Sequence, residues 1–418
     1  MISKTKFTAS SLILLFLVQS TVLALERRSD QFPKDFGYVF LPIPYSLPGA
    51  GSGFGLLGGF NNIPFGSTET TTDLFLVGIS GDISGVIAGF TDIPIWPETL
   101  LLDYFTLNFN KGSFRTYRNR KMDSDPDDYL VSELSDTSLM GGRIILTVFD
   151  RMFEIFTIQY DIKNTLSAIR DNEGELLYET DQKFEVTSKS YGSQIDWTDD
   201  RIDPLKGARL IYTYADSPSA SADSPDYFVQ TYNFTGYIPV GISTFAVNWF
   251  RSGATVRKEG NTDLTYLISK EKLQCLTNCD DETINVLAKN QQATNRYGSA
   301  GSLGGSGRLR SYAGGRYSGA QVAFRAAEFR WNLTDKKTPF DFYFVSDVRT
   351  GFQIAFFYEE GSVADVESEL WDIKRTSTGI GTRLLTSSGF VYRLDVATGQ
   401  EGREFSLIFD YPWGAIGR

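Results

Sequence analysis

The chain has 418 residues, a net charge of −11 at pH 7 and no histidine. Its acidic balance excludes nucleic acid as an expected partner, because phosphates would be repelled. The lack of histidine removes the commonest general base and the commonest metal ligand, and two cysteines are too few for a four-ligand zinc site. We therefore expect no enzyme activity, no metal and no other cofactor.

Residues 1–24 have the pattern of a secretory signal peptide. Lys4 and Lys6 precede an apolar core, and a small-residue cleavage site ends at Ala24. The apolar core is too short to span a bilayer, which disfavours the alternative of an uncleaved anchor. We expect the mature chain to begin near Leu25, outside the cytoplasm.

Residues 25–50 contain several prolines and predict a periplasmic lead-in rather than a domain. From Gly51 a glycine-rich strand pattern begins, and alternating apolar and polar residues recur as far as residue 413. The remaining residues, 414–418, are expected to be a short tail. The apolar faces of four clear segments are Phe105, Leu107 and Phe109; Phe245, Val247 and Trp249; Phe390, Tyr392, Leu394 and Val396; and Phe405, Leu407, Phe409, Tyr411 and Trp413.

These two-faced strands suit a membrane barrel, whose outer face is apolar and whose lumen is polar. A soluble sandwich is the alternative, but aromatic residues recur at strand ends, as in the interfacial girdles of barrels. An open sheet cannot survive in lipid because its unpaired backbone groups cost several kcal/mol each. We predict an all-β, transmembrane antiparallel β-barrel over residues 51–413.

The period changes between Gly260 and Gly301, where a long extracellular insertion is predicted. Asp280 or Asp281 can cap a short helix that continues through residue 290. Just before it, Cys275 and Cys279 can form a small loop disulfide in an oxidising compartment. A redox pair is the alternative, but the Cys-x-x-Cys spacing is absent.

A glycine-dense loop at residues 302–319 carries Arg308, Arg310 and Arg316. Glycine permits backbone conformations that other residues avoid, so the loop can fold into a tight, irregular shape. We predict that it folds back into the lumen and that carboxylates on the wall hold it there.

This loop and the strand after it resemble the loop and strand that mark the bacterial surface antigen family. That family comprises the barrels of outer-membrane protein insertases and two-partner secretion transporters. Its larger members carry polypeptide-transport-associated domains before the barrel, and residues 25–50 are too few for one. The matching segments are Arg310-Ser311-Tyr312 in place of Arg-Gly-Phe/Tyr, Asp196 to Gly207 as a strand-turn signature, Phe357 to Gly361 in place of Phe-x-Asp-x-Gly, and the aromatic C-terminal strand.

The resemblance implies sixteen strands and a lumenal pair between the loop arginine and an acid on a neighbouring strand. The residues of this expected loop lock are Arg310, Ser311, Tyr312, Glu328, Glu359 and Gly361. Alternation independently turns Glu359 inward, whereas Glu328 shares its parity with Phe324 and Ala326 and would need a bulge. The alternative is that these are ordinary lumenal charges.

The resemblance also implies a weakly paired seam between the first and last strands. Its expected residues are Gly53, Gly55, Phe409, Tyr411 and Trp413; a fully closed seam is the alternative. In the strand-turn signature, Asp196 to Asp203 could hold a hard cation, but a solvated turn is favoured.

The resemblance places the protein in the outer membrane of a Gram-negative bacterium. It predicts a monomeric barrel that assists insertion or translocation of polypeptide or lipid, with outer-membrane lipids and a client or periplasmic polypeptide as partners. A plugged anchor and a passive pore for small solutes are the alternatives.

Overall fold

The computed structural model describes residues 36–65, 71–120, 122–201, 203–275, 280–334, 339–342, 345–386, 391–409 and 411–413. The expected signal peptide at residues 1–24 and the expected tail at residues 414–418 lie outside these residues. Cys279 also lies outside them, while Cys275 is disulfide-bonded. Among the described residues, no helix is long and apolar enough to cross a bilayer.

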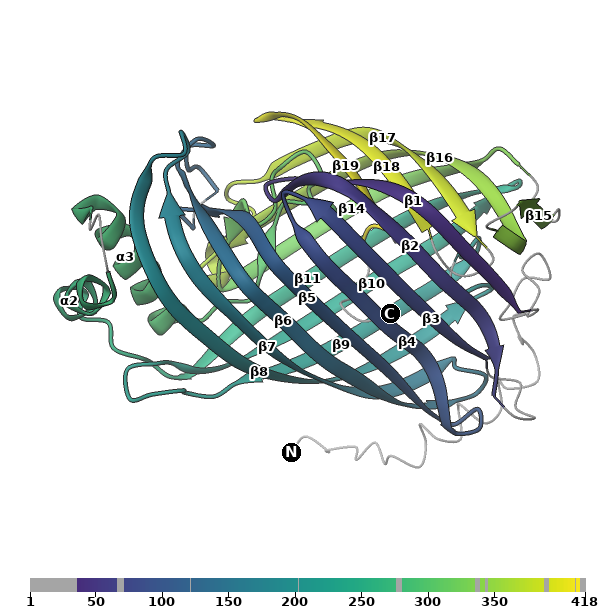
Figure 1. Cartoon of the computed structure of the whole chain (residues 1–418), viewed down its shortest axis with the longest axis horizontal. Coiled ribbons are helices and arrows are strands. Elements are labelled where there is room, and N and C mark those ends of the chain that lie inside the picture. The colour runs from purple at the N-terminus through teal and green to yellow at the C-terminus, as the bar shows by residue number, and fades with distance from the viewer. Residues whose placement is uncertain are drawn as a thin grey trace, which may run out of the picture.

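The fold is a closed antiparallel β-barrel, which confirms the predicted fold class (Figure 1). Seventeen strands form one sheet. The short β15 (Pro339–Phe342) is added to β16, and the other sixteen close the barrel. These are β1 (Gly37–Leu47), β2 (Gly51–Pro64), β3 (Thr71–Gly81), β4 (Ser84–Trp96), β5 (Leu100–Tyr117), β6 (Tyr129–Val148), β7 (Phe153–Arg170), β8 (Leu176–Thr198), β9 (Gly207–Ser217), β10 (Asp226–Val240), β11 (Ser243–Lys258), β14 (Gln321–Asn332), β16 (Val345–Ala364), β17 (Arg375–Thr386), β18 (Val391–Gly399) and β19 (Gly402–Phe409).

The two ends of the barrel differ. At one end, here called the terminal end, β1 begins and β19 stops. At the other, the loop end, lie the helices α2 (Leu264–Gln274) and α3 (Asp281–Tyr297), a 3-10 turn (Glu367–Glu369) and the two-stranded pair β12 (Ser302–Leu303) and β13 (Tyr317–Ser318) (Figure 1). As predicted, Asp280 caps α3, because its carboxylate accepts a hydrogen bond from the Thr283 amide at 2.7 Å.

An apolar belt covers the outside of the barrel. Large exposed apolar side chains occur all the way round, from Leu56 on β2 through Ile144 on β6 and Trp249 on β11 to Phe356 on β16. Their partners in sequence alternate inward. This is the pattern of a barrel whose outer face contacts lipid.

The barrel begins earlier than predicted. β1 starts at Gly37 and pairs with β2 along its whole length, so the expected lead-in at residues 25–50 already contains the first strand. The sequence did not reveal this strand because its prolines suggest a segment that does not pair in a sheet. Pro42 and Pro44 are tolerated because β1 is fully paired on one side only.

One alternating segment faces the opposite way from the prediction. Phe105, Leu107 and Phe109 share the inward face of β5 with Asp103, which is buried and bonded to Arg143 at 2.6 Å. Tyr104, on the polar face in the prediction, is exposed on the outside. Alternation distinguishes two faces of a strand but does not say which one is lumenal. The other segments turn apolar side chains outward, as Phe245, Trp249, Leu394 and Phe405 do, whereas Tyr411 and Trp413, beyond the end of β19, are buried.

Candidate functional site: the arginine loop and the seam

The site is built on residues 302–319, here called the arginine loop. Gly304, Gly305 and Gly315 have positive φ angles, and a Cβ on Gly304 would stand 2.1 Å from the Ala313 carbonyl oxygen. Only glycine fits such a backbone without strain. The loop therefore turns back on itself between β12 and β13 and places its arginines inside the barrel.

Arg310 lies at the centre of the site, with a side chain that is 0% exposed. Its guanidinium contacts three carboxylates from three strands, and its backbone amide donates to Glu359 Oε2 at 2.8 Å. The ion pairs are Nη2 to Glu328 Oε2 at 3.0 Å on β14, Nε to Glu359 Oε1 at 2.9 Å on β16, and Nη1 to Asp395 Oδ2 at 2.8 Å on β18. The planar group also lies 3.3 Å above the centre of the Phe357 ring.

The same carboxylates bind further arginines of the wall. Glu328 pairs with Arg330 at 2.8 Å and Arg383 at 2.7 Å, and Asp395 also accepts from Arg393. Four buried guanidiniums thus face three carboxylates in a space with little water. Such a network stabilises only when every member is paired, and losing one leaves an uncompensated charge.

Asp395 was not among the predicted lock residues. Its strand alternation had already placed it on the polar face with Arg393, but no local signal joins it to an arginine 85 positions earlier. The predicted lock named two acids, Glu328 and Glu359, and the structure adds Asp395 as the third.

Glu328 faces inward without the expected bulge, because β14 pairs in unbroken register with both β11 and β16. The apolar residues of the same parity, such as Phe324, also face inward, where they pack against Leu303, Leu309 and other loop residues. The inward face of β14 is apolar because the arginine loop covers it.

Gly361 makes room for this packing. A Cβ at that position would stand 2.6 Å from Leu303 Cδ1 and 3.0 Å from Leu309 Cδ1. The predicted lock glycine thus acts by close approach, since two loop leucines lie directly against its strand. Ser311 contributes its backbone amide, which donates to the Ser377 hydroxyl at 3.1 Å.

The loop also reaches the rim of the barrel at the loop end. Arg316 Nη2 pairs with Glu401 Oε1 at 2.8 Å, in the β18–β19 turn, and Nη1 donates to the Ser124 hydroxyl at 2.7 Å, in the β5–β6 loop. The Tyr312 hydroxyl contacts the side chain of Gln400 in the same β18–β19 turn. The arginine loop therefore bridges the β18–β19 turn and the β5–β6 loop at this end of the barrel.

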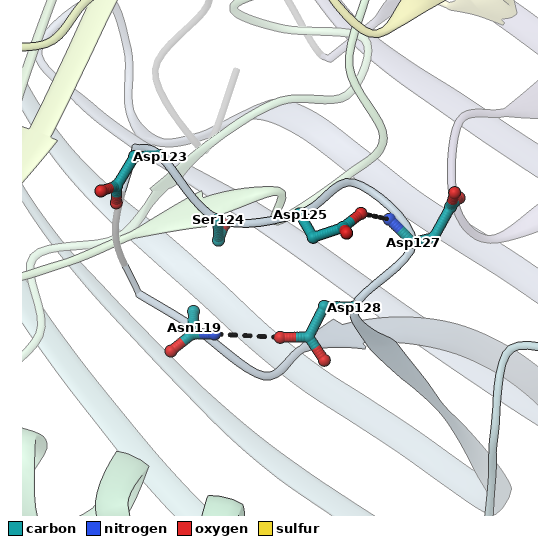
Figure 2. A pocket seen from close by; sticks show the side chains of 6 residues that line it. All are labelled: Asn119, Asp123, Ser124, Asp125, Asp127 and Asp128. Atoms are coloured by element: carbon teal, nitrogen blue, oxygen red, sulfur yellow. Dashed lines mark hydrogen bonds between the residues drawn. The ribbon is translucent and has the colours of Figure 1, made fainter.

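The β5–β6 loop that receives Arg316 lines an acidic pocket (Figure 2). Asn119 Nδ2 donates to Asp128 Oδ2 at 2.9 Å, and the Asp127 amide donates to Asp125 Oδ1 at 2.9 Å. These bonds shape the loop itself. The lining residues are Asn119, Asp123, Ser124, Asp125, Asp127 and Asp128.

The seam between β1 and β19 is weakly paired. Among the described residues, its register consists of one pair, Ser46 opposite Leu407, although β1 pairs with β2 at every position. The carbonyl of Pro44 points toward the seam, where it accepts from the Tyr392 hydroxyl at 2.8 Å. In an antiparallel strand the amide and carbonyl of one residue point the same way, so Pro42 and Pro44 both remove donors from the seam edge.

At the terminal end, β1 pairs instead with the extension of β16. Tyr38 lies opposite Ser346 and Val39 opposite Val345. Between Val39 and Ser46, the seam edge of β1 has no strand partner among the described residues. This stretch is called the window below.

Of the five predicted seam residues, Phe409 lies on a seam strand and the other four lie elsewhere. Gly53 and Gly55 are on β2, which is paired on both sides, because β1 precedes it. Phe409 ends β19, but Tyr411 and Trp413 have left the strand and are buried in the lumen. The alternating aromatics that predicted a longer last strand instead form an inward turn, here called the C-terminal turn (411–413).

The C-terminal turn contacts both the arginine loop and the wall. Trp413 donates from Nε1 to Glu359 Oε1 at 3.3 Å, and its carbonyl accepts from Asn233 Nδ2 at 2.8 Å. The Tyr411 ring lies between two buried cations, with Arg330 Cζ 4.2 Å and Arg383 Cζ 4.9 Å from its centre. The turn thus covers cations that the three carboxylates do not fully neutralise.

The turn of the strand-turn signature is also buried, contrary to the prediction of a solvated turn. Asp196 and Asp203 are each at most 1% exposed. Asp196 pairs with Arg209 at 3.1 Å, and Asp203 accepts from the Tyr411 hydroxyl. The strand-turn segment therefore forms the part of the wall that contacts the C-terminal turn.

Comparisons with known proteins find resemblance in structure only. No protein-family model and no curated protein matches the chain. Similar solved structures include BamA from Haemophilus ducreyi lacking POTRA domains 1-3 (13% identity, TM-score 0.47, covering 90% of this chain and 70% of that one). CdiB from Escherichia coli has 14% identity and a TM-score of 0.46; 90% of this chain is covered, but only 60% of CdiB. Wzi from Escherichia coli, described as a carbohydrate-binding β-barrel involved in capsule assembly, has 12% identity and a TM-score of 0.27, with 98% and 90% covered. The fold rests on the strand pairings of this chain itself.

Proposed function

We propose that the protein is an outer-membrane barrel that assists the insertion or translocation of polypeptide or lipid through the seam between β1 and β19. The observation that carries the proposal is that, within the described part of the chain, one backbone pair joins these strands, while the arginine loop contacts both sides of the seam. A sheet edge without partners in lipid is costly, so a protein retains one where it has a use.

The arginine loop joins the two sides of the seam at the loop end. The Gly314 amide donates to the Pro48 carbonyl at 2.8 Å, in the β1–β2 turn. On the other side, Arg316 holds Glu401 and Arg310 holds Asp395. These few contacts of the arginine loop can break without the loss of a long series of backbone hydrogen bonds. This suits a seam that opens and closes again.

The loop and the C-terminal turn occupy the lumen, which favours a sideways route over an axial one. Arg310 and Trp413 are both buried, and Trp413 Nε1 bonds to Glu359, one of the Arg310 partners. A solute passing along the axis would have to displace this network. This observation also supports the second candidate function, a plugged barrel that acts as a surface anchor.

The two candidates are tested by locking the seam. Ser46→Cys with Leu407→Cys places two cysteines at opposed positions, within the reach of a disulfide. In phospholipid vesicles, the unlocked protein should accelerate folding of a small urea-unfolded β-barrel protein, and oxidation of the pair should abolish the acceleration. Reduction should restore it.

The matched control places a disulfide between two fully paired strands. Phe54→Cys with Ser80→Cys joins β2 to β3, again at opposed outward positions. Its oxidation should leave the acceleration unchanged. Equal acceleration by the locked and unlocked seam would overturn the seam route, and no acceleration by either protein would favour the anchor.

A further inference from the structure

The inner wall beside the seam is apolar, unlike the charged wall around Arg310. Ile43, Leu57 and Val77 are at most 8% exposed and form one cluster on the inward faces of β1, β2 and β3. Leu41, Phe75 and Ile79 pack against them. Barrel lumens are ordinarily polar, so an apolar surface here indicates a ligand of matching character.

This wall continues from the window. Leu41 and Ile43 lie on β1 between Val39 and Ser46, at the stretch of seam edge without a strand partner among the described residues. On the outside, the same stretch of β1 carries the exposed Phe40, part of the lipid-facing belt. Tyr392 of β18 packs against the cluster and donates from its hydroxyl to the Pro44 carbonyl at this stretch. A hydrocarbon chain that enters from the bilayer would displace this tyrosine and pass the backbone edge of β1 before it reaches the apolar wall.

A polar group lies at the terminal end of the wall. Asn61, on the inward face of β2, is 2% exposed, and neither its Nδ2 nor its Oδ1 has a hydrogen-bond partner among the described residues. A buried amide without partners is destabilising, so its retention points to a polar atom that it binds. It stands four residues from Leu57, about 13 Å along the strand.

We propose that the inner wall of β1–β3 binds the hydrocarbon chain of a membrane lipid, which enters through the window and places a polar head atom near Asn61. The inference rests on the proposed function and selects lipid as the substrate class. A polypeptide fits less well. β2 and β3 are paired on both edges, so its backbone amides would find no partners there, whereas a hydrocarbon chain has none to satisfy.

The test uses a photoreactive amino acid, p-benzoylphenylalanine, at Phe75 on the inner wall. The full chain is reconstituted in vesicles of phosphatidylethanolamine and phosphatidylglycerol, irradiated, and examined by intact mass for covalent lipid adducts. We expect an adduct at Phe75. Phe54, 73% exposed on the outside of β2, is the positive control. Thr231 is the lumenal negative control, because it contacts the Ser252 hydroxyl on the polar wall at 2.9 Å.

The route is tested by locking the seam with Ser46→Cys and Leu407→Cys before lipid is added in detergent. Locking should remove the adduct at Phe75 and leave the one at Phe54. At limiting lipid, Asn61→Leu should lower the Phe75 yield about fivefold through the loss of one hydrogen bond, again without affecting Phe54.

An adduct at Phe54 but not at Phe75 would overturn the lumenal site, and an adduct at Phe75 that persists in the locked barrel would overturn the lateral route. Client folding is measured on the same preparations. Faster client folding without a lipid adduct at Phe75 would overturn this inference and keep the proposed function. A lipid adduct at Phe75 that requires the open seam, without faster client folding, would support lipid as the substrate.

Discussion

At the scale of single residues, the arginine loop is held by one guanidinium, that of Arg310, which pairs with carboxylates on three strands. A lysine could not do this, because its point charge lacks the planar fork that reaches Glu328, Glu359 and Asp395 in fixed directions. The burial of Arg310 matters most for Glu359, whose ion pair among the described residues is with Arg310, whereas Glu328 and Asp395 also pair with arginines of the wall.

Replacing Arg310 by methionine should therefore destabilise the barrel by about 3 to 5 kcal/mol, because buried carboxylates lose their shared partner. The measurement is the temperature at which the folded band converts to the unfolded band in a gel. Arg325→Met is the matched control, because Arg325 lies on β14, the strand of Glu328, but its side chain is 59% exposed. Similar shifts for the two variants would contradict the central role of Arg310.

Gly361 gives a second prediction at this scale. Gly361→Ala should cost about 1 to 3 kcal/mol by overpacking, because the new methyl group meets Leu303 and Leu309. Adding Leu303→Ala should recover part of the loss. Gly78→Ala on β3 is the control, since its Cβ would meet nothing within 4 Å. If Gly78→Ala destabilises as much, strand glycines matter for another reason.

At the scale of elements, the alternation of polarity located strands well but did not assign their faces or ends. It continued through Tyr411 and Trp413, so a longer last strand was predicted where the chain turns inward. It also missed β1, whose prolines lie on the seam edge, where β1 forms few backbone pairs with β19. Both errors occur at the seam, where the rules for regular sheets are relaxed.

The C-terminal turn should act as a plug in the lumen. Deleting residues 411–418 would uncover Arg330 and Arg383, which the Tyr411 ring now covers. In planar bilayers we expect higher conductance with a preference for anions, because four arginines face three carboxylates there. Trp331→Ala, on the outward face of β14, should leave conductance unchanged. Unaltered conductance in the truncated protein would show that other residues close the lumen.

At the scale of the whole molecule, the barrel has two unlike regions. Strands β14 to β18 carry the ionic network that holds the arginine loop, whereas β1 to β3 carry an apolar cluster on their inner face. The motif resemblance predicted the first region, because it rests on a short run of residues around Arg310. The second region has no motif, and its character emerges only when the strand pairings show which faces are lumenal.

The seam lies between these two regions, and proline contributes to its weak backbone pairing. Extending the register from Ser46 and Leu407 places Pro44 opposite Phe409, the last residue of β19. Pro44→Thr should supply the missing amide donor and favour strand geometry, so the seam should open less often. We expect slower client folding and slower amide exchange in β1. The control is Pro239→Thr on β10, a position that lies away from the seam and pairs with Thr244 of β11. The seam edge of β1 also carries the backbone amides of Phe40 and Ser46, whose hydrogen exchange reports on seam opening. Unchanged exchange of these amides after Pro44→Thr would mean that the arginine loop alone determines how often the seam opens.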